Sequence, residues 1–115
     1  MSFMLTTEQF KNRTKTVTRR LGWSFLEAGD IVNGCKKCQG LKPGEKIEKL
    51  GQIRILKTNY EYLDRMVVNP EYGQQEAIKE GFPELTGAEF VTMFAENMKC
   101  PEHEIVNRIE FEYLN

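Results

Sequence analysis

The sequence predicts a single α+β domain built on a mostly antiparallel β-sheet. Segments with strand-like patterns outnumber helix-like segments, and the two kinds are not regularly interleaved as they are in a parallel α/β fold. The chain has 115 residues, 40% of them apolar and 29% charged, which is typical of an ordinary globular protein with one core. We therefore interpret residues 1–115 as one domain, a curled sheet or small barrel with helices to one side.

The N-terminal part is predicted to contain short strands and one short helix. Residues 2–5 have the character of a first strand, and a Thr followed three residues later by Gln predicts a helix over residues 6–12. Residues 14–20 are rich in β-branched side chains and should be extended. A turn over residues 25–30 then leads into a strand over residues 31–37.

The middle of the chain is predicted to contain an exposed loop, a long strand and a helix. The glycines, proline and lysines of residues 39–46 indicate the loop. Alternation over residues 51–63 predicts a strand with one buried face, which residues 69–73 should break. A helix is expected over residues 74–80 and should end at Gly81, the residue that tolerates a left-handed conformation.

The C-terminal part is predicted to contain a second helix and a last strand. Thr86 and Glu89 have the spacing of a capping box, and Leu85 can pack against Phe90 across the helix start. The strict alternation over residues 108–113 predicts a half-buried strand.

One apolar stripe recurs at helical spacing along the second helix. It consists of Phe90, Met93, Phe94 and Met98. Such a stripe is typical of the face that a helix packs on a core, so we interpret it as core packing and infer no cofactor from it.

Charge is distributed unevenly along the chain. Residues 11–57 carry twelve Lys or Arg against four Asp or Glu, a local charge of about +8, whereas residues 58–115 carry four against twelve, about −8. A basic region of this kind can attract anionic ligands, of which phosphate is the commonest in a cell. The alternative is that the two halves neutralise each other across the fold.

The composition also gives expectations about location. No run approaches the roughly 20 apolar residues of a membrane-spanning helix, and the N-terminus has no basic leader, so we expect a cytoplasmic protein without membrane contact. The cysteines, Cys35, Cys38 and Cys100, are an odd number in a domain that does not need a crosslink, so reduced thiols are expected.

A structural zinc site is the alternative use of these cysteines. Cys35 and Cys38, together with Cys100 and His103, have the spacing of two ligand pairs. The first pair lacks the turn glycine or proline of a zinc knuckle and begins on a predicted strand. We therefore expect no metal and no other cofactor, with Cys35 and Cys38 as buried thiols and His103 at the surface.

The strongest candidate for a functional site is the segment 13–20. Its four cations and three hydroxyls are Arg13, Thr14, Lys15, Thr16, Thr18, Arg19 and Arg20. Arg presents a planar fork of donors that matches phosphate, Lys a compact charge, and Thr a short hydrogen-bonding group. The segment therefore predicts binding of RNA or a nucleotide. A solvated basic strand edge, which prevents unwanted strand pairing, is the alternative.

Three motifs in this order resemble the ASCH family. They are Lys-Thr-Val-Thr-Arg-Arg at 15–20, Leu-Glu-Ala-Gly-Asp-Ile-Val at 26–32, and Lys-Glu-Gly-Phe-Pro-Glu at 79–84 ahead of Glu-Phe at 89–90. The resemblance runs through nearly the whole chain. It implies a PUA-like fold, which is a small, mostly antiparallel β-barrel with flanking helices, and a cleft beside the barrel that holds RNA or a nucleotide.

The resemblance also implies a reaction. Some small members of the family are similar to amidohydrolases that use a Lys, a Thr and a Glu to remove an acyl group from the exocyclic amine of cytidine. The Lys-x-x-Thr pair carries over onto Lys15 and Thr18, and Glu80 is the nearest match to the acid. A Thr hydroxyl becomes a nucleophile when a base takes its proton, and Lys15 can be that base when burial and nearby cations lower its pKa. Glu80 would then protonate the leaving amine or position water.

Geometry sets a condition on this scheme. Residues three apart in a regular strand point to opposite faces, so Lys15 and Thr18 can cooperate only if the chain turns or bulges between them. The chain also departs from the small hydrolytic members in its Lys-rich loop over residues 38–49 and in Leu21-Gly22-Trp23 directly after Arg20.

These departures keep a second function open. The additional cations suit a longer nucleic acid, with Lys36, Lys37 and Lys42 as further contacts and Trp23 as a stacking surface or a core residue. The sequence thus predicts an RNA- or nucleotide-binding domain, with an amidohydrolase on acylated cytidine nucleosides as the alternative, and we expect a monomer.

Overall fold

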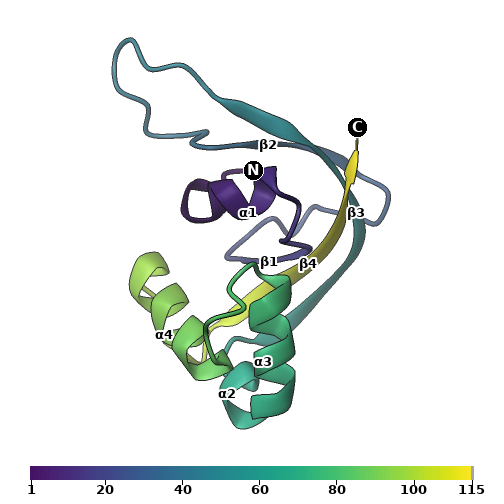
Figure 1. Ribbon diagram of the computed structural model, residues 1–115, viewed down its shortest axis with the longest axis vertical. Coiled ribbons are helices and arrows are strands. Elements are labelled where there is room, and N and C mark those ends of the chain that lie inside the picture. Colours follow the sequence, from purple (N-terminus) through teal and green to yellow (C-terminus); the bar gives the residue numbers. More distant parts are fainter. Residues whose placement is uncertain (115) are drawn as a thin grey trace.

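The computed structural model describes residues 1–114, which form an α+β fold. In chain order its elements are η1 (Met4–Thr6), α1 (Thr7–Lys11), β1 (Val17–Arg20), β2 (Ile31–Cys35), β3 (Lys49–Tyr62), α2 (Arg65–Val68), α3 (Pro70–Lys79), α4 (Gly87–Met98) and β4 (Ile105–Leu114) (Figure 1). None of the described helices is long and apolar enough to cross a membrane.

The four strands form one antiparallel sheet in the order β1-β4-β3-β2. The long strands β3 and β4 pair from Gln52↔Leu114 to Tyr62↔Ile105, with a bulge between Ile55 and Lys57. Strands β1 and β2 are the two edges and do not pair with each other within residues 1–114. The predicted antiparallel α+β class is therefore confirmed, whereas the sheet is open and not closed into the expected barrel.

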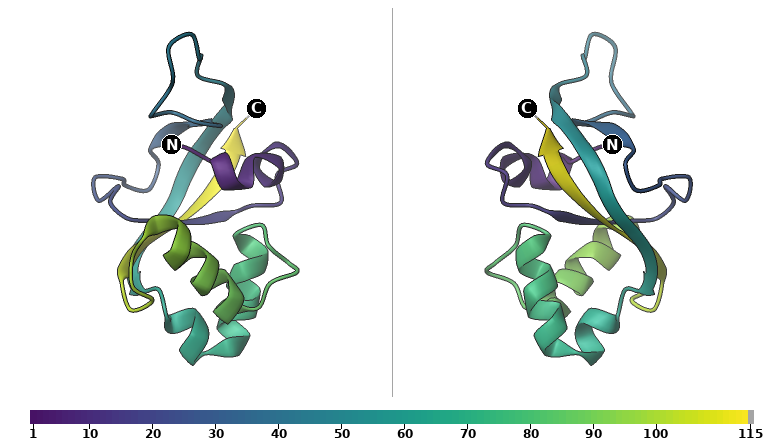
Figure 2. Two further views of the ribbon diagram at one scale, coloured as in Figure 1. Left: turned by 90° about the vertical axis from the view of Figure 1, so that its left-hand side faces the viewer. Right: turned by 90° about the vertical axis from the view of Figure 1, so that its right-hand side faces the viewer.

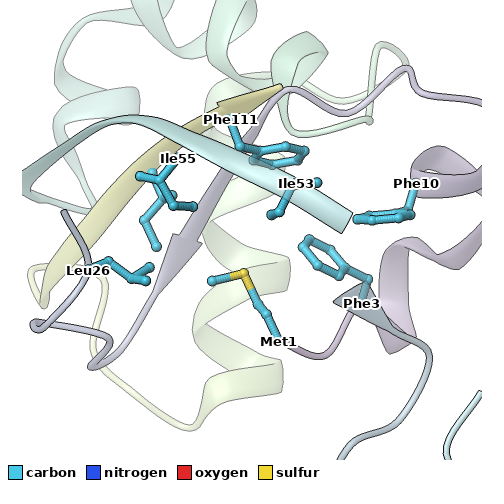
Figure 3. Packing of buried hydrophobic residues seen from close by; sticks show 8 residues of the cluster. Met1, Phe3, Phe10, Leu26, Ile53, Ile55 and Phe111 are labelled. Carbon is cyan, nitrogen blue, oxygen red and sulfur yellow. The ribbon is translucent and has the colours of Figure 1, made fainter. Parts of the chain in front are cut away.

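Two hydrophobic clusters hold the fold together. The first lies between the sheet and the N-terminal segment (Figure 3) and consists of Met1, Phe3, Phe10, Leu26, Ile53, Ile55, Ile109 and Phe111. The second lies among the helices and consists of Leu63, Met66, Ala77, Phe90, Val91, Phe94 and Val106. Both β3 and β4 contribute residues to the first cluster. Val106 of β4 and Leu63, which directly follows β3, belong to the second cluster. The two clusters therefore lie at opposite ends of the same pair of long strands.

The helices differ from prediction at the start of α3. Residues 69–73 were expected to form a break, but Asn69 caps α3, its side chain accepting a hydrogen bond from the backbone N–H of Tyr72 at 3.2 Å. Pro70 occupies the first helical position, where its missing N–H costs nothing and its fixed φ favours a helix. Proline here begins a helix; it does not interrupt the chain.

The start of α4 is as predicted. The Thr86 hydroxyl accepts from the Glu89 N–H at 3.1 Å, and the Glu89 carboxylate accepts from the Thr86 N–H at 3.0 Å. The helix then packs against α3 at two glycines, because a Cβ on Gly73 would lie 2.0 Å from the Met66 carbonyl oxygen and one on Gly87 would lie 2.6 Å from the Gly73 Cα. These glycines allow α3 and α4 to approach closely.

The N-terminal segment is less regular than predicted. Ser2 forms a single parallel bridge with Cys35, and residues 4–6 form a 3-10 helix in place of the expected strand. The predicted helix follows as α1, but Thr6 makes no side-chain capping bond. The predicted strands over residues 14–20, 31–37 and 51–63 correspond to β1, β2 and β3.

Candidate functional site: a cavity beside β1

A cavity of about 250 Å³ lies beside edge strand β1. Its walls come from residues 2–6, from β1 and Lys15 shortly before the strand, from the end of α3, and from α4. Figure 2 shows how β1 passes between the N-terminal helix α1 and helix α4. Lys15, Thr18, Arg19, Arg20 and Glu80 all line this one cavity.

Lys15 is buried and paired with Glu80. Its Nζ donates to the Glu80 Oε1 at 2.7 Å and to the Glu80 carbonyl oxygen at 2.9 Å, and the two residues are only 3% and 2% exposed. Burial lowers the pKa of Lys15 below the ordinary value of 10.5, and the charges of Arg20 and Arg19 act in the same direction, whereas Glu80 opposes them. The lysine therefore gives up its proton more readily than a solvated lysine does.

The backbone places this pair from two distant segments. Glu80 is the C-cap of α3, and the next residue, Gly81, has a φ of +99° that ends the helix there. On the other side, the Thr16 N–H donates to the Lys79 carbonyl at 2.8 Å, which fixes the segment before β1 against the end of α3. The Tyr113 hydroxyl donates to the Lys15 carbonyl at 2.5 Å.

The start of β1 bears on the geometric condition set on Lys15 and Thr18. Strand β1 begins at Val17, so Lys15 precedes the strand and the alternation of strand side chains does not apply to it. Both side chains line the same cavity, and both are buried.

Arg19 acts inside the protein, because carboxylates use its terminal nitrogens. These nitrogens donate to carboxylate oxygens of Glu80 at 2.9 Å, of Glu61 at 3.0 Å and of Glu76 at 2.7 Å. Burial by itself would lower the pKa of Arg19, but the three carboxylates raise it above the ordinary value. Arg19 is thus a permanent charge that lines the cavity and also holds the Glu80 carboxylate.

Arg19 belongs to what we call the buried charge cluster. Its members are Lys15, Arg19, Glu61, Glu76, Glu80 and Arg108. Two of the three cations come from the basic half of the chain, and all three carboxylates come from the acidic half. At this site the two halves neutralise each other, which is the alternative interpretation of the charge asymmetry.

Arg20 differs from its neighbour. Within residues 1–114 it makes no ion pair; its Nε donates to the Thr18 hydroxyl at 3.1 Å, and its guanidinium lies 4.8 Å from the centre of the Phe3 ring. Burial lowers the pKa of Arg20 to about 10, so it remains a cation at neutral pH. Its remaining donors can bind an anion or a polarised carbonyl oxygen in the cavity.

The other predicted binding residues lie outside the cavity. Thr16 is exposed, Arg13 lies 5.5 Å from the centre of the Tyr113 ring, and Trp23 packs beside the first cluster and 5.3 Å from the Phe25 ring. Lys36, Lys37 and Lys42 belong to the segment between β2 and β3, where Lys37 pairs with Glu45 at 3.5 Å. The structure does not bring these residues together with Lys15 and Thr18.

The cavity also has an apolar wall that the sequence did not reveal. It is formed by Phe3, Phe82, Phe90, Met93, Phe94 and Met98. The interpretation of the α4 stripe as core packing holds for three of its residues, because Phe90 and Phe94 are in the second cluster and Met93 packs against it. All four stripe residues also line the cavity, and Met98 is 41% exposed. The helical spacing correctly predicted which face of α4 is apolar, but it could not show that part of this face borders the cavity.

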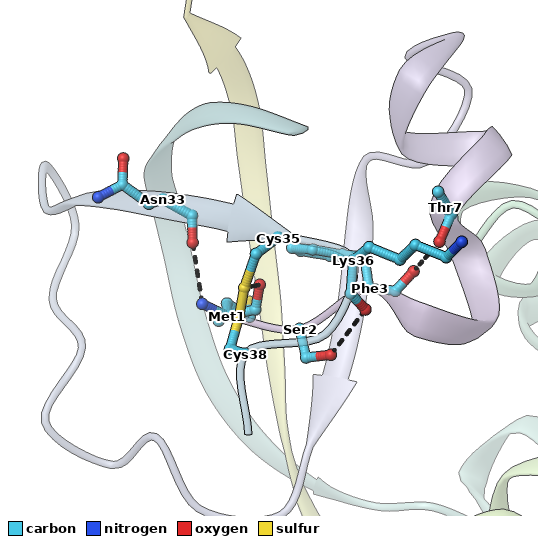
Figure 4. Close-up of a disulfide and its surroundings, with 8 residues drawn as sticks. All are labelled: Met1, Ser2, Phe3, Thr7, Asn33, Cys35, Lys36 and Cys38. Atoms are coloured by element: carbon cyan, nitrogen blue, oxygen red, sulfur yellow. Dashed lines mark hydrogen bonds between the residues drawn. A yellow bond between two sulfur atoms is a disulfide. The ribbon is translucent and has the colours of Figure 1, made fainter. Parts of the chain in front are cut away.

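The cysteines differ from expectation. Cys35 and Cys38 form a disulfide (Figure 4), with their Cα atoms 5.9 Å apart, where reduced thiols were predicted. The chain turns directly after β2, which brings Cys38 back to Cys35. No group of three or more metal-ligating side chains occurs in the described part of the chain.

No family model, curated protein or solved structure matches the chain. The functional assignment therefore depends on the geometry of the cavity and on the three motifs.

Proposed function

We propose that the chain is an ASCH-type domain whose cavity hydrolyses the acyl amide of a small acylated base or nucleoside of the cytidine type. The observation that carries this proposal is the convergence of Lys15, Thr18 and Glu80 on one cavity, with the Lys15 Nζ 2.7 Å from the Glu80 carboxylate. These are the three residue types, at the matching positions, that the family resemblance implies.

The size and lining of the cavity support a small substrate. A volume of about 250 Å³ lies just below the roughly 300–1,000 Å³ of pockets that bind drug-sized ligands. Three aromatic rings, those of Phe82, Phe90 and Phe94, provide flat apolar surfaces for a heterocycle. The charged lining residues are Lys15, Arg19, Arg20 and Glu80. The cavity is suited to one ring system and not to a length of RNA.

The chemistry follows from the positions of the side chains. Neutral Lys15 takes the proton of the Thr18 hydroxyl, and the donor from Arg20 stabilises the negative charge that develops on that oxygen. The Thr18 oxygen then bonds to the carbonyl carbon of the amide, and the C–N bond breaks as the amine leaves with the proton from Lys15.

The second half of the reaction restores the enzyme. Glu80, as a carboxylate held by Lys15 and Arg19, accepts a proton from water, and the resulting hydroxide attacks the ester on Thr18. The C–O bond to Thr18 breaks, the Thr18 oxygen takes the proton that Glu80 accepted from water, and a carboxylic acid leaves.

The test is hydrolysis of a panel of N4-acylated cytosines and cytidines by the purified protein. We expect turnover in the wild type and a loss of about 10²-fold or more in Lys15→Ala and in Thr18→Ala, with partial activity in Thr18→Ser because the hydroxyl is kept. Lys57→Ala is the matched control, since Lys57 is an exposed lysine on β3 outside the cavity. No turnover by folded wild-type protein on any member of the panel would refute the proposal.

The rate should also depend on pH in a defined direction. Only neutral Lys15 can act as the base, so kcat/KM should rise with pH and level off at a pH below the ordinary lysine value of 10.5, because burial lowers the pKa of Lys15. A rate that falls as the pH rises from neutral would exclude Lys15 as the base.

A nucleotide-binding domain without turnover is the second candidate, and Arg20 favours it. Its guanidinium lines the cavity without a carboxylate partner among the described residues, which suits a phosphate. In that case cytidine monophosphate should bind more tightly than cytidine, the difference should shrink as salt is added, and Arg20→Gln should remove it. Equal affinity for the two ligands would exclude this candidate.

A further inference from the structure

The disulfide lies at the start of a lysine-rich segment that the proposed reaction does not use. We call residues 36–48 the basic segment; it follows β2 and its lysines are Lys36, Lys37, Lys42 and Lys46. Cys35, the last residue of β2, is 4% exposed, and Cys38 is half-buried within the segment. We propose that Cys35–Cys38 is a thiol-exchange site, at which a small thiol of the glutathione class reversibly reduces the disulfide and frees the basic segment.

The crosslink is not needed to hold the fold. The stabilisation that a disulfide gives through chain entropy grows with the length of the loop it closes, and this one joins residues only three apart. Strand β2 is held instead by its pairing with β3, from Ile31↔Arg54 to Cys35↔Lys49. Breaking the crosslink therefore leaves the sheet intact.

The surroundings favour exchange at the Cys38 sulfur. Cys35 is buried, so an entering thiolate reaches Cys38 first. It forms a bond to the Cys38 Sγ, the Cys35–Cys38 bond breaks, and the electron pair remains on the Cys35 sulfur. Lys36 and Lys37 lie between the two cysteines, and positive charge nearby stabilises a leaving thiolate.

A second thiolate completes the exchange. It attacks the entering sulfur of the mixed disulfide and releases the Cys38 thiolate, so that two molecules of the small thiol are oxidised to one disulfide. The protein gains two electrons, and its two thiolates take up protons from water.

The structure provides a place for the reduced Cys35. Its Sγ lies 3.4 Å from the Met1 carbonyl oxygen (Figure 4). A disulfide sulfur has no proton to donate, but a thiol does, so reduction creates a hydrogen-bond donor beside an existing acceptor. The backbone hydrogen bonds at the end of β2 do not involve the sulfur. The Cys35 N–H donates to the Met1 carbonyl oxygen at 3.0 Å, and the Phe3 N–H donates to the Cys35 carbonyl oxygen at 2.8 Å.

The basic segment has few other attachments. The Ser2 hydroxyl donates to the Lys36 carbonyl at 3.1 Å, and the Lys11 Nζ lies 3.9 Å from the Glu48 carboxylate. The hydrogen bond from the Lys36 N–H to the Glu48 carbonyl, at 2.9 Å, is internal to the segment. Loss of the crosslink removes the covalent restraint on Cys38. Reduction should therefore loosen the basic segment and leave the N-terminal wall of the cavity in place.

The test combines thiol counting with amide hydrogen exchange on the full chain. Protein isolated without reductant is incubated with millimolar glutathione, its free thiols are alkylated and located by mass spectrometry, and exchange is followed before and after. We expect Cys35 and Cys38 to become alkylated and exchange in residues 36–48 to rise about tenfold, with residues 1–6 and β2 unchanged.

Three variants make the test specific. Cys38→Ser should exchange rapidly in the basic segment with or without glutathione, and Cys100→Ser should behave as the wild type. The double variant Lys36→Gln, Lys37→Gln should be reduced several-fold more slowly. The proposal is overturned by a disulfide that resists glutathione in the folded protein, by two thiols that persist in oxidising buffer, or by unchanged exchange in residues 36–48 after reduction.

Discussion

The buried charge cluster and the basic segment contain the same kinds of side chain in opposite settings. In the cluster, Lys15 and Arg19 are almost fully buried and each donates to carboxylates from the other half of the chain. In the basic segment, Lys36 and Lys42 are exposed, and Lys37 pairs with Glu45 at 3.5 Å. A count of charges along the sequence treats these cations alike, whereas their energetic and chemical roles depend on burial.

The largest effect should follow from breaking the cluster at Arg19. Arg19→Met removes the cation that Glu61, Glu76 and Glu80 share and leaves buried carboxylates without it, so we expect the free energy of unfolding to fall by about 3–5 kcal/mol. Chemical denaturation measures this. Arg54→Ala is the matched control, because Arg54 pairs with Glu112 at the surface and should cost less than about 1 kcal/mol. Similar losses in both variants would contradict the distinction.

Acid should weaken the same cluster. Burial by itself would raise the pKa of Glu76, but hydrogen bonds and charges from Arg108 and Arg19 lower it from 4.5 to about 2. Because the folded-state pKa is lowered, this contribution is present above pH 4.5 and is lost as the pH falls towards 2. It amounts to on the order of 3 kcal/mol. Denaturation at a series of pH values should show the loss in the wild type and a smaller one in Glu76→Gln.

Gly81 directly follows Glu80, and its backbone conformation fixes where this member of the buried charge cluster lies. Gly81→Ala places a side chain at a φ of +99°, and its Cβ would lie 2.8 Å from the Gln9 Cγ, so we expect a loss of about 1–2 kcal/mol and a displaced Glu80. Gly44→Ala in the basic segment has a similar φ of +87° with nothing within 4 Å. It should reduce global stability less, because that segment is not packed on the core.

The smallest effect should come from the lysines of the basic segment. Lys42→Ala and Lys46→Ala remove exposed charges, and each should change the free energy of unfolding by no more than about 0.5 kcal/mol. A larger change in thermal or chemical denaturation would mean that the segment supports the fold.

Much of the fold could be predicted because it depends on local patterns. The capping box of Thr86 and Glu89, the helix end at Gly81 and the strand over residues 108–113 each involve neighbours in sequence, and all three are present. Arg108 departs from the predicted alternation because it is buried. The error at residues 69–73 is also local: an Asn-Pro pair is compatible with a turn or with a helix start, and here Asn69 caps α3 while Pro70 occupies its first position.

The site could be predicted only in part. Lys15, Thr18 and Glu80 were identified from motifs, but the partners of Arg19 are 42, 57 and 61 residues away, and no local pattern pairs them. Adjacent Arg19 and Arg20 appeared equivalent in sequence, although Arg19 pairs with three carboxylates and Arg20 makes no ion pair within residues 1–114. The apolar wall was missed because a stripe beside a cavity has the same spacing as a stripe in a core.

The most direct test of the central claim is to look for the covalent intermediate. The wild-type protein and Glu80→Gln, whose slowed second step should retain the acyl group, are mixed with N4-acetylcytidine, quenched in acid and digested for mass spectrometry. We predict an acetyl group on Thr18, more abundant in Glu80→Gln and absent from Thr18→Ala. Acylation of Lys15 instead, or turnover that persists in Thr18→Ala, would contradict the account.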